Sequence, residues 1–232
     1  NCSKEYFKDA RVRRAFSMAI NRKNIVDQLL FGEGVIAVGP LPPHHPYFNE
    51  KIKDDPYDPE AAKALLKEAG WDFNRELEFY VPTGNKVREN SATLIQQDLA
   101  AVGVKTKLQF MDFTTQINNL RESKGDLGLL GGAGSVDPDD ARVLLSVGTP
   151  MSFSHIQDSA LFDLATEARN KPTSEQRKPL YYELQEKLVE ESPYIWLYHA
   201  NVLMAHRDIF DNLPIEDFPN LNYAAHTWTF KK

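Results

Sequence analysis

The chain has 232 residues, 42% of them hydrophobic and 11% aromatic, which is enough for one large core or for one domain with an appendage. Its formal net charge is -6, with 27 Lys and Arg against 33 Asp and Glu. The basic residues form no run, which argues against nucleic acid or an anionic membrane as a partner. The sequence has no apolar stretch long enough to span a bilayer.

The single cysteine, Cys2, excludes an internal disulfide and a zinc site built from several thiolates. The first five residues lack the basic and apolar segments of a signal peptide. We therefore expect either that such a segment was removed or that the chain starts partway into a longer protein. Cys2 could be a lipoprotein anchor, but no lipobox precedes it, and an ordinary thiol is the favoured reading.

The first part of the chain predicts helices separated by a proline-rich loop. Residues 9–20 combine a capping aspartate with an apolar stripe, and a shorter helix is expected over residues 23–31. Residues 39–46 contain four prolines and must be irregular. The sequence Asp58-Pro59-Glu60 starts another helix, which Gly70 ends. Its inward-facing residues are predicted to be Ala61, Leu65 and Ala69.

After Trp71 the hydrophobic period changes to two. Residues 77–81 and 104–110 alternate as strands do, with a helix expected between them over residues 86–102. Such a strand-helix-strand unit implies parallel neighbours and a right-handed crossover. A helix over residues 113–123 and a buried strand over residues 127–130 should follow.

The last third of the chain predicts three helices and another strand. Asp137-Pro138 is expected to open the first helix, and Leu161, Leu164 and Ala168 mark the second. Thr173 and Gln176 have the spacing of a capping box for the third. The apolar run 194–198 is predicted to be a strand of the same sheet, continued by residues 202–205. The fold class is therefore α/β, with a central mixed sheet flanked by helices.

Two histidine-containing segments carry residue types used in catalysis or metal binding, but not the required pattern. His44 and His45 stand side by side in the proline-rich loop, where adjacent side chains point apart. Ser154, His155 and Asp158 are triad residue types, yet no GxSxG elbow surrounds the serine. No HExxH pair is present either. We expect no metal, no cofactor and no catalytic turnover.

The glycine-rich turn at residues 131–135 is the preferred candidate for a ligand site. It lies between a predicted strand and a predicted helix, and its glycines allow close backbone approach by a ligand. In open α/β sheets, ligands bind beyond the carboxyl ends of the strands. The alternative is a tight turn in which glycine serves packing alone. The predicted ligand-facing residues are Gly134, Ser135, Asp137, Phe153 and His155.

Two long segments, residues 7–22 and residues 57–71, carry extended sequence motifs, and four shorter segments accompany them in order: residues 39–43, 100–104, 175–181 and 191–195. Together they resemble the peptide-, opine- and nickel-binding family of solute-binding proteins of ABC importers. Residues 7–22 are similar to that family's signature helix, and residues 57–71 fit the next helix almost residue for residue. The resemblance covers about residues 5–210.

This resemblance implies a type II periplasmic-binding-protein-like fold that closes about a hinge on a small-molecule or peptide ligand. Residues 1–205 would form the C-terminal lobe, and residues 206–232 a tail that returns to a missing N-terminal lobe. The implied partners are that lobe and the permease subunits of the importer, at the periplasmic or extracellular face of the cell membrane. Contact with the membrane would come only through the permease or a lipid anchor outside this chain.

The predicted site departs from the family's ligand patterns, so the ligand class stays open. Peptide binders place an aspartate three residues before an acidic-Pro pair; here the pair is Asp137-Pro138 and that position is Gly134. The nickel pattern puts aromatics beside the pair, where this chain has Val136 and Gly132. A peptide or peptide-like solute is the leading expectation. One alternative is a metabolite-sensing lobe of a transcriptional regulator. A second is a hydrolase, although the missing catalytic motifs argue against it.

Overall fold

The computed structural model describes residues 1–53, 55–132, 137–145, 152–203, 205, 207–212 and 228–231. The chain divides into two compact units, Asn1–His199 and Ala200–Lys232. The predicted boundary at residue 205 and the role of residues 206–232 as a returning tail stay predictions. Among the described residues, no helix is both long and apolar enough to cross a bilayer.

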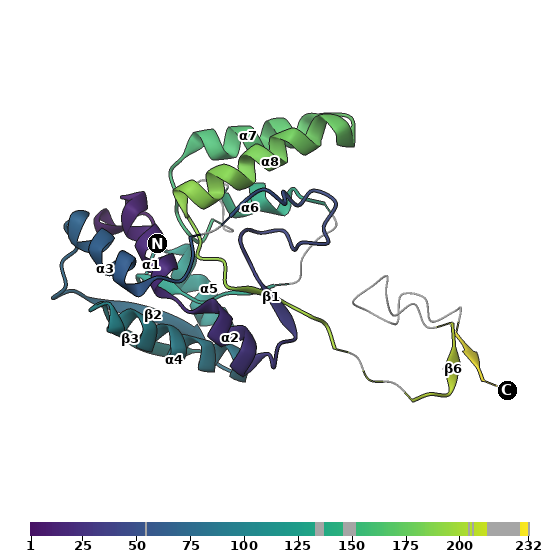
Figure 1. Cartoon of the computed structure of the whole chain (residues 1–232), viewed down its shortest axis with the longest axis horizontal. Coiled ribbons are helices and arrows are strands. Elements are labelled where there is room, and N and C mark those ends of the chain that lie inside the picture. Colours follow the sequence, from purple (N-terminus) through teal and green to yellow (C-terminus); the bar gives the residue numbers. More distant parts are fainter. Residues whose placement is uncertain are drawn as a thin grey trace. The chain divides into compact units, whose positions relative to one another are not determined.

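The first unit contains most of the regular structure (Figure 1). Its helices are the short 3-10 helix η1 (Glu5–Phe7), α1 (Ala10–Ala19), α2 (Arg22–Leu29), α3 (Pro59–Glu68), α4 (Lys86–Ala101), α5 (Phe113–Arg121), α6 (Asp140–Leu145), α7 (Ser159–Asn170) and α8 (Ser174–Glu191). The strands of the chain are β1 (Gly34–Ile36), β2 (Glu76–Pro82), β3 (Lys105–Met111), β4 (Leu127–Gly128), β5 (Tyr198–Ala200), β6 (Phe210–Asp211) and β7 (Thr229–Phe230).

Short polar side chains fix where the helices begin. Asp9 accepts a hydrogen bond from the backbone N–H of Arg11, Asp58 from that of Ala61, and Thr173 from that of Gln176. Each of these bonds satisfies a backbone donor that has no partner within the helix. The three predicted caps are therefore confirmed.

The central sheet has the order β3-β2-β4, and its three described strands run parallel. Phe79 of β2 lies opposite Leu108 of β3 and Leu127 of β4. Helix α4 connects β2 to β3 and packs along both of them, which confirms the predicted crossover unit (Figure 1). The inner face of α4 is formed by Ser91, Ile95 and Leu99, which are buried together with the following Val102.

Two hydrophobic clusters stabilise the first unit. The first joins α1, α3, α4 and the sheet, and contains Trp71, whose ring packs edge-on against Phe16. The second forms where the paired helices α7 and α8 meet the proline-rich loop, and contains Tyr47 and Leu41 of that loop (Figure 1). The free thiol of Cys2 is buried in this second cluster, and burial raises its pKa.

Residues 194–198 do not form the predicted strand of the central sheet. The strand of this region, β5, begins at Tyr198 and pairs with β1 in a separate two-stranded sheet. The hydroxyl of Tyr194 donates to the Leu144 carbonyl and accepts from the Ser154 N–H, so the apolar run packs as an irregular segment. The expected continuation of the strand is also wrong, because Val202 and Leu203 are outside regular structure and exposed.

Two helix predictions need smaller corrections. The first helix after the glycine-rich turn begins at Asp140 rather than at Asp137, because the Asp137 carboxylate accepts from the Asp139 N–H in a turn. On α3, the fully buried positions are Ala62 and Leu66, while the predicted Leu65 and Ala69 are partly buried against the same cluster. The sequence holds Ala or Leu at both sets of positions, so the period alone did not determine the stripe.

Candidate functional site

The carboxyl ends of the parallel strands meet at one edge of the sheet, which is where open α/β folds bind ligands. The chain leaves β2 at Thr83, whose N–H donates to the Met111 carbonyl at the end of β3 over 2.8 Å. It leaves β4 through Leu129 toward Gly131 and Gly132. The first part of the predicted glycine-rich turn therefore lies at this carboxyl edge.

Helix α4 contributes a cation to the carboxyl edge. Asn85 caps the helix by accepting from the Arg88 N–H, and the Arg88 side chain then donates through Nη2 to the Gly131 carbonyl over 2.9 Å. A Cβ atom at Gly131 would lie 3.0 Å from that guanidinium nitrogen, so glycine permits the approach. A Cβ atom at Gly132 would meet nothing within 4 Å, which leaves open space in front of it.

Helix α5 contributes a buried amide to the same edge. The Gln116 side chain is fully buried, and its Nε2 donates to the carbonyls of Tyr80 and Leu129 over 3.2 and 3.0 Å. These two carbonyls belong to adjacent strand ends, because the Leu129 N–H itself donates to the Tyr80 carbonyl. Gln116 thus bridges the outgoing chains of β2 and β4.

The predicted ligand-facing residues are only partly described. Gly134 and Ser135 lie outside the described residues. The exposed Asp137 accepts from Arg177 Nη2 over 2.9 Å. Phe153 and His155 are half-buried, and the His155 Nε2 lies 2.6 Å from the Leu120 carbonyl at the end of α5. Asp137 and His155 are therefore held by different helices, and their role toward a ligand stays a prediction.

Arg177 on α8 forms a small cluster around Asp137. Its guanidinium lies 5.5 Å from the ring centroids of both Tyr47 and Tyr181, a distance at which cation–π attraction contributes. Hydrogen bonds to Tyr181 and then Asp137 raise the pKa of Arg177, so the group stays charged. This cluster links the chain after the glycine-rich turn to the second hydrophobic cluster.

The residue types of a catalytic triad are engaged in separate contacts. Asp158 caps α7 by accepting from the Ala160 N–H over 2.9 Å, whereas the His155 ring bonds the Leu120 carbonyl. The two adjacent histidines also differ, since His44 is exposed and His45 is buried with Nδ1 accepting from the Tyr47 N–H. In the described ranges no three His, Cys, Asp or Glu side chains gather in a way that could hold a metal ion.

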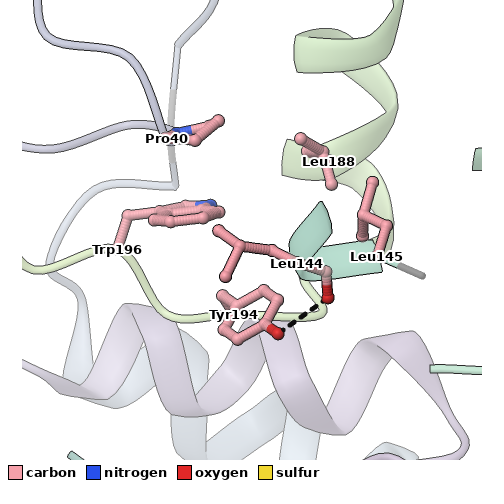
Figure 2. Close-up of a pocket in the computed structure, with 6 residues that line it drawn as sticks. All are labelled: Pro40, Leu144, Leu145, Leu188, Tyr194 and Trp196. Atoms are coloured by element: carbon pink, nitrogen blue, oxygen red, sulfur yellow. Dashed lines mark hydrogen bonds between the residues drawn. The ribbon is translucent and has the colours of Figure 1, made fainter. Parts of the chain in front are cut away.

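Figure 2 shows an apolar crevice between the proline-rich loop, α6, α8 and the segment before β5. Trp196 and Tyr194 form one wall, and the Tyr194 hydroxyl donates to the Leu144 carbonyl over 3.0 Å. The lining side chains are packed too closely to admit a water molecule. We interpret the crevice as an imperfection of side-chain packing and not as a solute site.

The architecture matches that of solved solute-binding proteins. The oligopeptide-binding protein AppA of Bacillus subtilis, solved in complex with a nonapeptide, gives a TM-score of 0.82 at 25% sequence identity, over 100% of this chain and 49% of that chain. The chain therefore has the fold of a type II periplasmic binding protein, as the sequence predicted.

The sequence profile of the bacterial extracellular solute-binding proteins, family 5 Middle, matches residues 1–152, and the chain belongs to this family. The Di/tripeptide-binding protein 2 of Pseudomonas aeruginosa is 33% identical over 216 residues, which are 89% of this chain and 40% of that protein. The Heme-binding protein A of Haemophilus influenzae is 31% identical over 208 residues, 86% of this chain and 38% of that protein. The chain thus spans about two fifths of the length of these curated relatives.

Sequence reasoning missed Arg88 and Gln116 as residues of the carboxyl edge. A pattern was available for Arg88, because a cation in the first turn of a helix that follows a strand must lie near that edge. Gln116 carries no comparable pattern: a polar residue on a helix is ordinarily solvated, and only the tertiary packing buries this one.

Proposed function

We propose that the protein carrying this chain is the substrate-binding component of an ABC importer and captures a peptide or peptide-like solute. Family membership supports the proposal, as do the names of the relatives, which include a di/tripeptide-binding protein and an oligopeptide-binding protein with a bound nonapeptide. In this proposal the protein binds its solute without chemical turnover. It acts at the periplasmic or extracellular face of the membrane and delivers the solute to permease subunits.

The carboxyl edge of the sheet is the observation that carries this function. It combines open space in front of Gly132, a backbone that glycine leaves accessible, and the positive charge of Arg88. A peptide offers backbone acceptors and a terminal carboxylate, and a guanidinium suits such groups. The solute-facing surface would extend along the chain to the predicted Gly134, Ser135 and Asp137, with Phe153 and His155 on the following loop. An N-terminal lobe would cover the solute from the other side.

The variant Gly132→Trp tests the proposed location. The open space in front of Gly132 should accommodate the indole without disturbing the fold, while the indole fills the volume that a solute would occupy. In the full-length protein, we expect peptide affinity, measured by calorimetry with peptides that native mass spectrometry identifies in the purified protein, to fall at least tenfold.

A matched control is Glu183→Trp, which places the same side chain at an exposed position of α8. This control should bind peptides as the wild type does. Unchanged affinity in a folded Gly132→Trp protein would place the solute elsewhere. Recovery of a non-peptide compound, such as a haem, in the native mass spectrum would refute the peptide class.

A further inference from the structure

We propose that Gln116 and Arg88 are positioning residues that hold the chain leaving β4 and thereby shape the solute-facing edge, without Gln116 itself touching a solute. This inference rests on the proposed function for its binding consequence. Its structural part stands on the hydrogen bonds alone, and the two parts can be tested separately.

Strand β4 is too short to direct the chain that follows it. It pairs with β2 at only two positions, Phe79 with Leu127 and Tyr80 with Gly128. One more ladder-like bond follows, from the Leu129 N–H to the Tyr80 carbonyl. No backbone partner among the described residues holds the carbonyls of residues 129 and 131. Within the described part of the chain, the donors to these two carbonyls are side chains.

Gln116 supplies the first of these donors. Its Nε2 meets the carbonyl oxygens of Tyr80 and Leu129, so only the amide nitrogen can face them, and the orientation of the amide is fixed. The side chain has no exposed surface, so its two hydrogen bonds form in a low-dielectric interior. Losing them would remove the side-chain donor of the Leu129 carbonyl, whereas the Tyr80 carbonyl would keep the bond from the Leu129 N–H.

Arg88 supplies the second donor, to the Gly131 carbonyl two residues further along. The carbonyls of residues 129 and 131 are thus held from two different helices, α5 and α4. A binding surface must be held within about 0.5 Å of its productive geometry to keep its affinity. The affinity for a solute at the carboxyl edge should therefore fall when either donor is lost, although Gln116 lies wholly beneath the surface.

The structural part is tested by NMR on the 232-residue chain without any solute. The variant Gln116→Met keeps the size of the side chain and removes both donors, and Arg88→Met removes the second anchor. We expect backbone order parameters at residues 130–132 to fall from about 0.85 toward about 0.6 in each variant, with those of β2 unchanged. Arg88→Lys keeps the charge without the planar fork and should show the same loss in part.

The binding part is tested by calorimetry on the full-length protein with trialanine as the probe. We expect affinity to fall about tenfold in Gln116→Met, mainly through faster dissociation. The hydrogen-exchange protection of the amides in β2 and β3 should stay unchanged. Where Gln116→Met does not fold, the order parameters of Arg88→Met decide the positioning role, because the Arg88 side chain is only half-buried. Order parameters that stay at wild-type values in Arg88→Met would overturn the positioning role.

The two proposals fail in different ways. Local loosening at residues 130–132 with no binding of trialanine or any other peptide would support the positioning role and count against the peptide function. Peptide binding of wild-type strength in Gln116→Met, with rigid glycines, would support the function and overturn the positioning role.

Discussion

Arg13 connects the start of the chain to the end of α8, which lies 178 positions further along the sequence. Its side chain is only 7% exposed, and its guanidinium donates to the carbonyls of Phe7 and Lys8 over 2.8 Å each. It also donates to the carbonyls of Glu191 and Ser192 at the end of α8. A cation at a helix C-terminus is favoured by the helix dipole, and the planar fork satisfies several carbonyls at once. The Arg13 side chain therefore holds the start of the chain against the end of α8.

We expect Arg13→Lys to lower the free energy of unfolding by about 2–4 kcal/mol, because one ammonium group cannot reach all of these buried carbonyls. Urea unfolding of the chain measures this loss. Arg11→Lys is the matched control on the same helix: Arg11 is about half exposed and pairs with Asp9 at the surface, so little change is expected. Equal losses of unfolding free energy in the two variants would show that the burial of the Arg13 guanidinium does not determine its contribution.

Tyr194 should make stability depend on alkaline pH. Burial raises the pKa of its hydroxyl above the ordinary value, more than the hydrogen bonds from Ser154 lower it. The unfolded tyrosine ionises near pH 10, whereas the folded one keeps its proton to higher pH. Above about pH 10 the folded state therefore binds more protons, and stability falls as pH rises.

The variant Tyr194→Phe tests this dependence. At neutral pH it should cost about 1–2 kcal/mol, because the Leu144 carbonyl and the Ser154 N–H lose their partner. The difference in unfolding free energy between wild type and variant should be constant below about pH 9 and should shrink above about pH 10. A difference that grows with pH would contradict the assignment.

At the scale of the elements, the link from α4 to β3 depends on one backbone conformation. Gly103 has φ of +90°, and a Cβ atom there would lie 3.2 Å from the Phe73 ring. Gly70 after α3 has φ of +73° but open space around it. A side chain at either position would therefore carry the cost of a left-handed backbone, and only one at position 103 would also make a close contact.

We expect Gly70→Ala to cost about 1 kcal/mol and Gly103→Ala about 1 kcal/mol more, measured by urea unfolding. The difference between the two isolates the contact with Phe73, since the backbone cost is shared. Equal losses would mean that Phe73 moves aside freely.

The sequence predicts elements well where local pattern and tertiary role agree. The capped helices α1 and α3 and the β2-α4-β3 unit follow from caps and hydrophobic period alone, and the structure confirms them. The strand prediction for residues 194–198 failed because an apolar run indicates that a segment is buried, but not whether it pairs with a strand. The carboxyl edge followed from the parallel topology. Its donors Arg88 and Gln116 did not, because carbonyls that lie far away in sequence define their roles.

At the scale of the whole molecule, the chain covers about two fifths of its relatives' length. Under the proposed function, a solute is buried between two lobes, and this chain supplies one of them. If each lobe gives half of the interaction in a micromolar complex of about 8 kcal/mol, the chain alone keeps about 4 kcal/mol, which corresponds to millimolar binding. Calorimetry of the 232-residue chain and the full-length protein with the same peptide measures the ratio. Equal affinities would show that the site is complete within this chain.

The Arg13 contact also has a consequence in time. Arg13 is separated from Glu191 by 178 positions in the sequence. At a synthesis rate of about 5–20 residues per second, roughly 10–35 s pass between the appearance of the guanidinium and that of its carbonyl partners. During this interval the nascent α1 carries a charged group that has no place to be buried. Within this chain, α1 is therefore made long before Arg13 can reach its final surroundings, and a ribosome-bound chain that stops before α8 should leave the Arg13 guanidinium exposed.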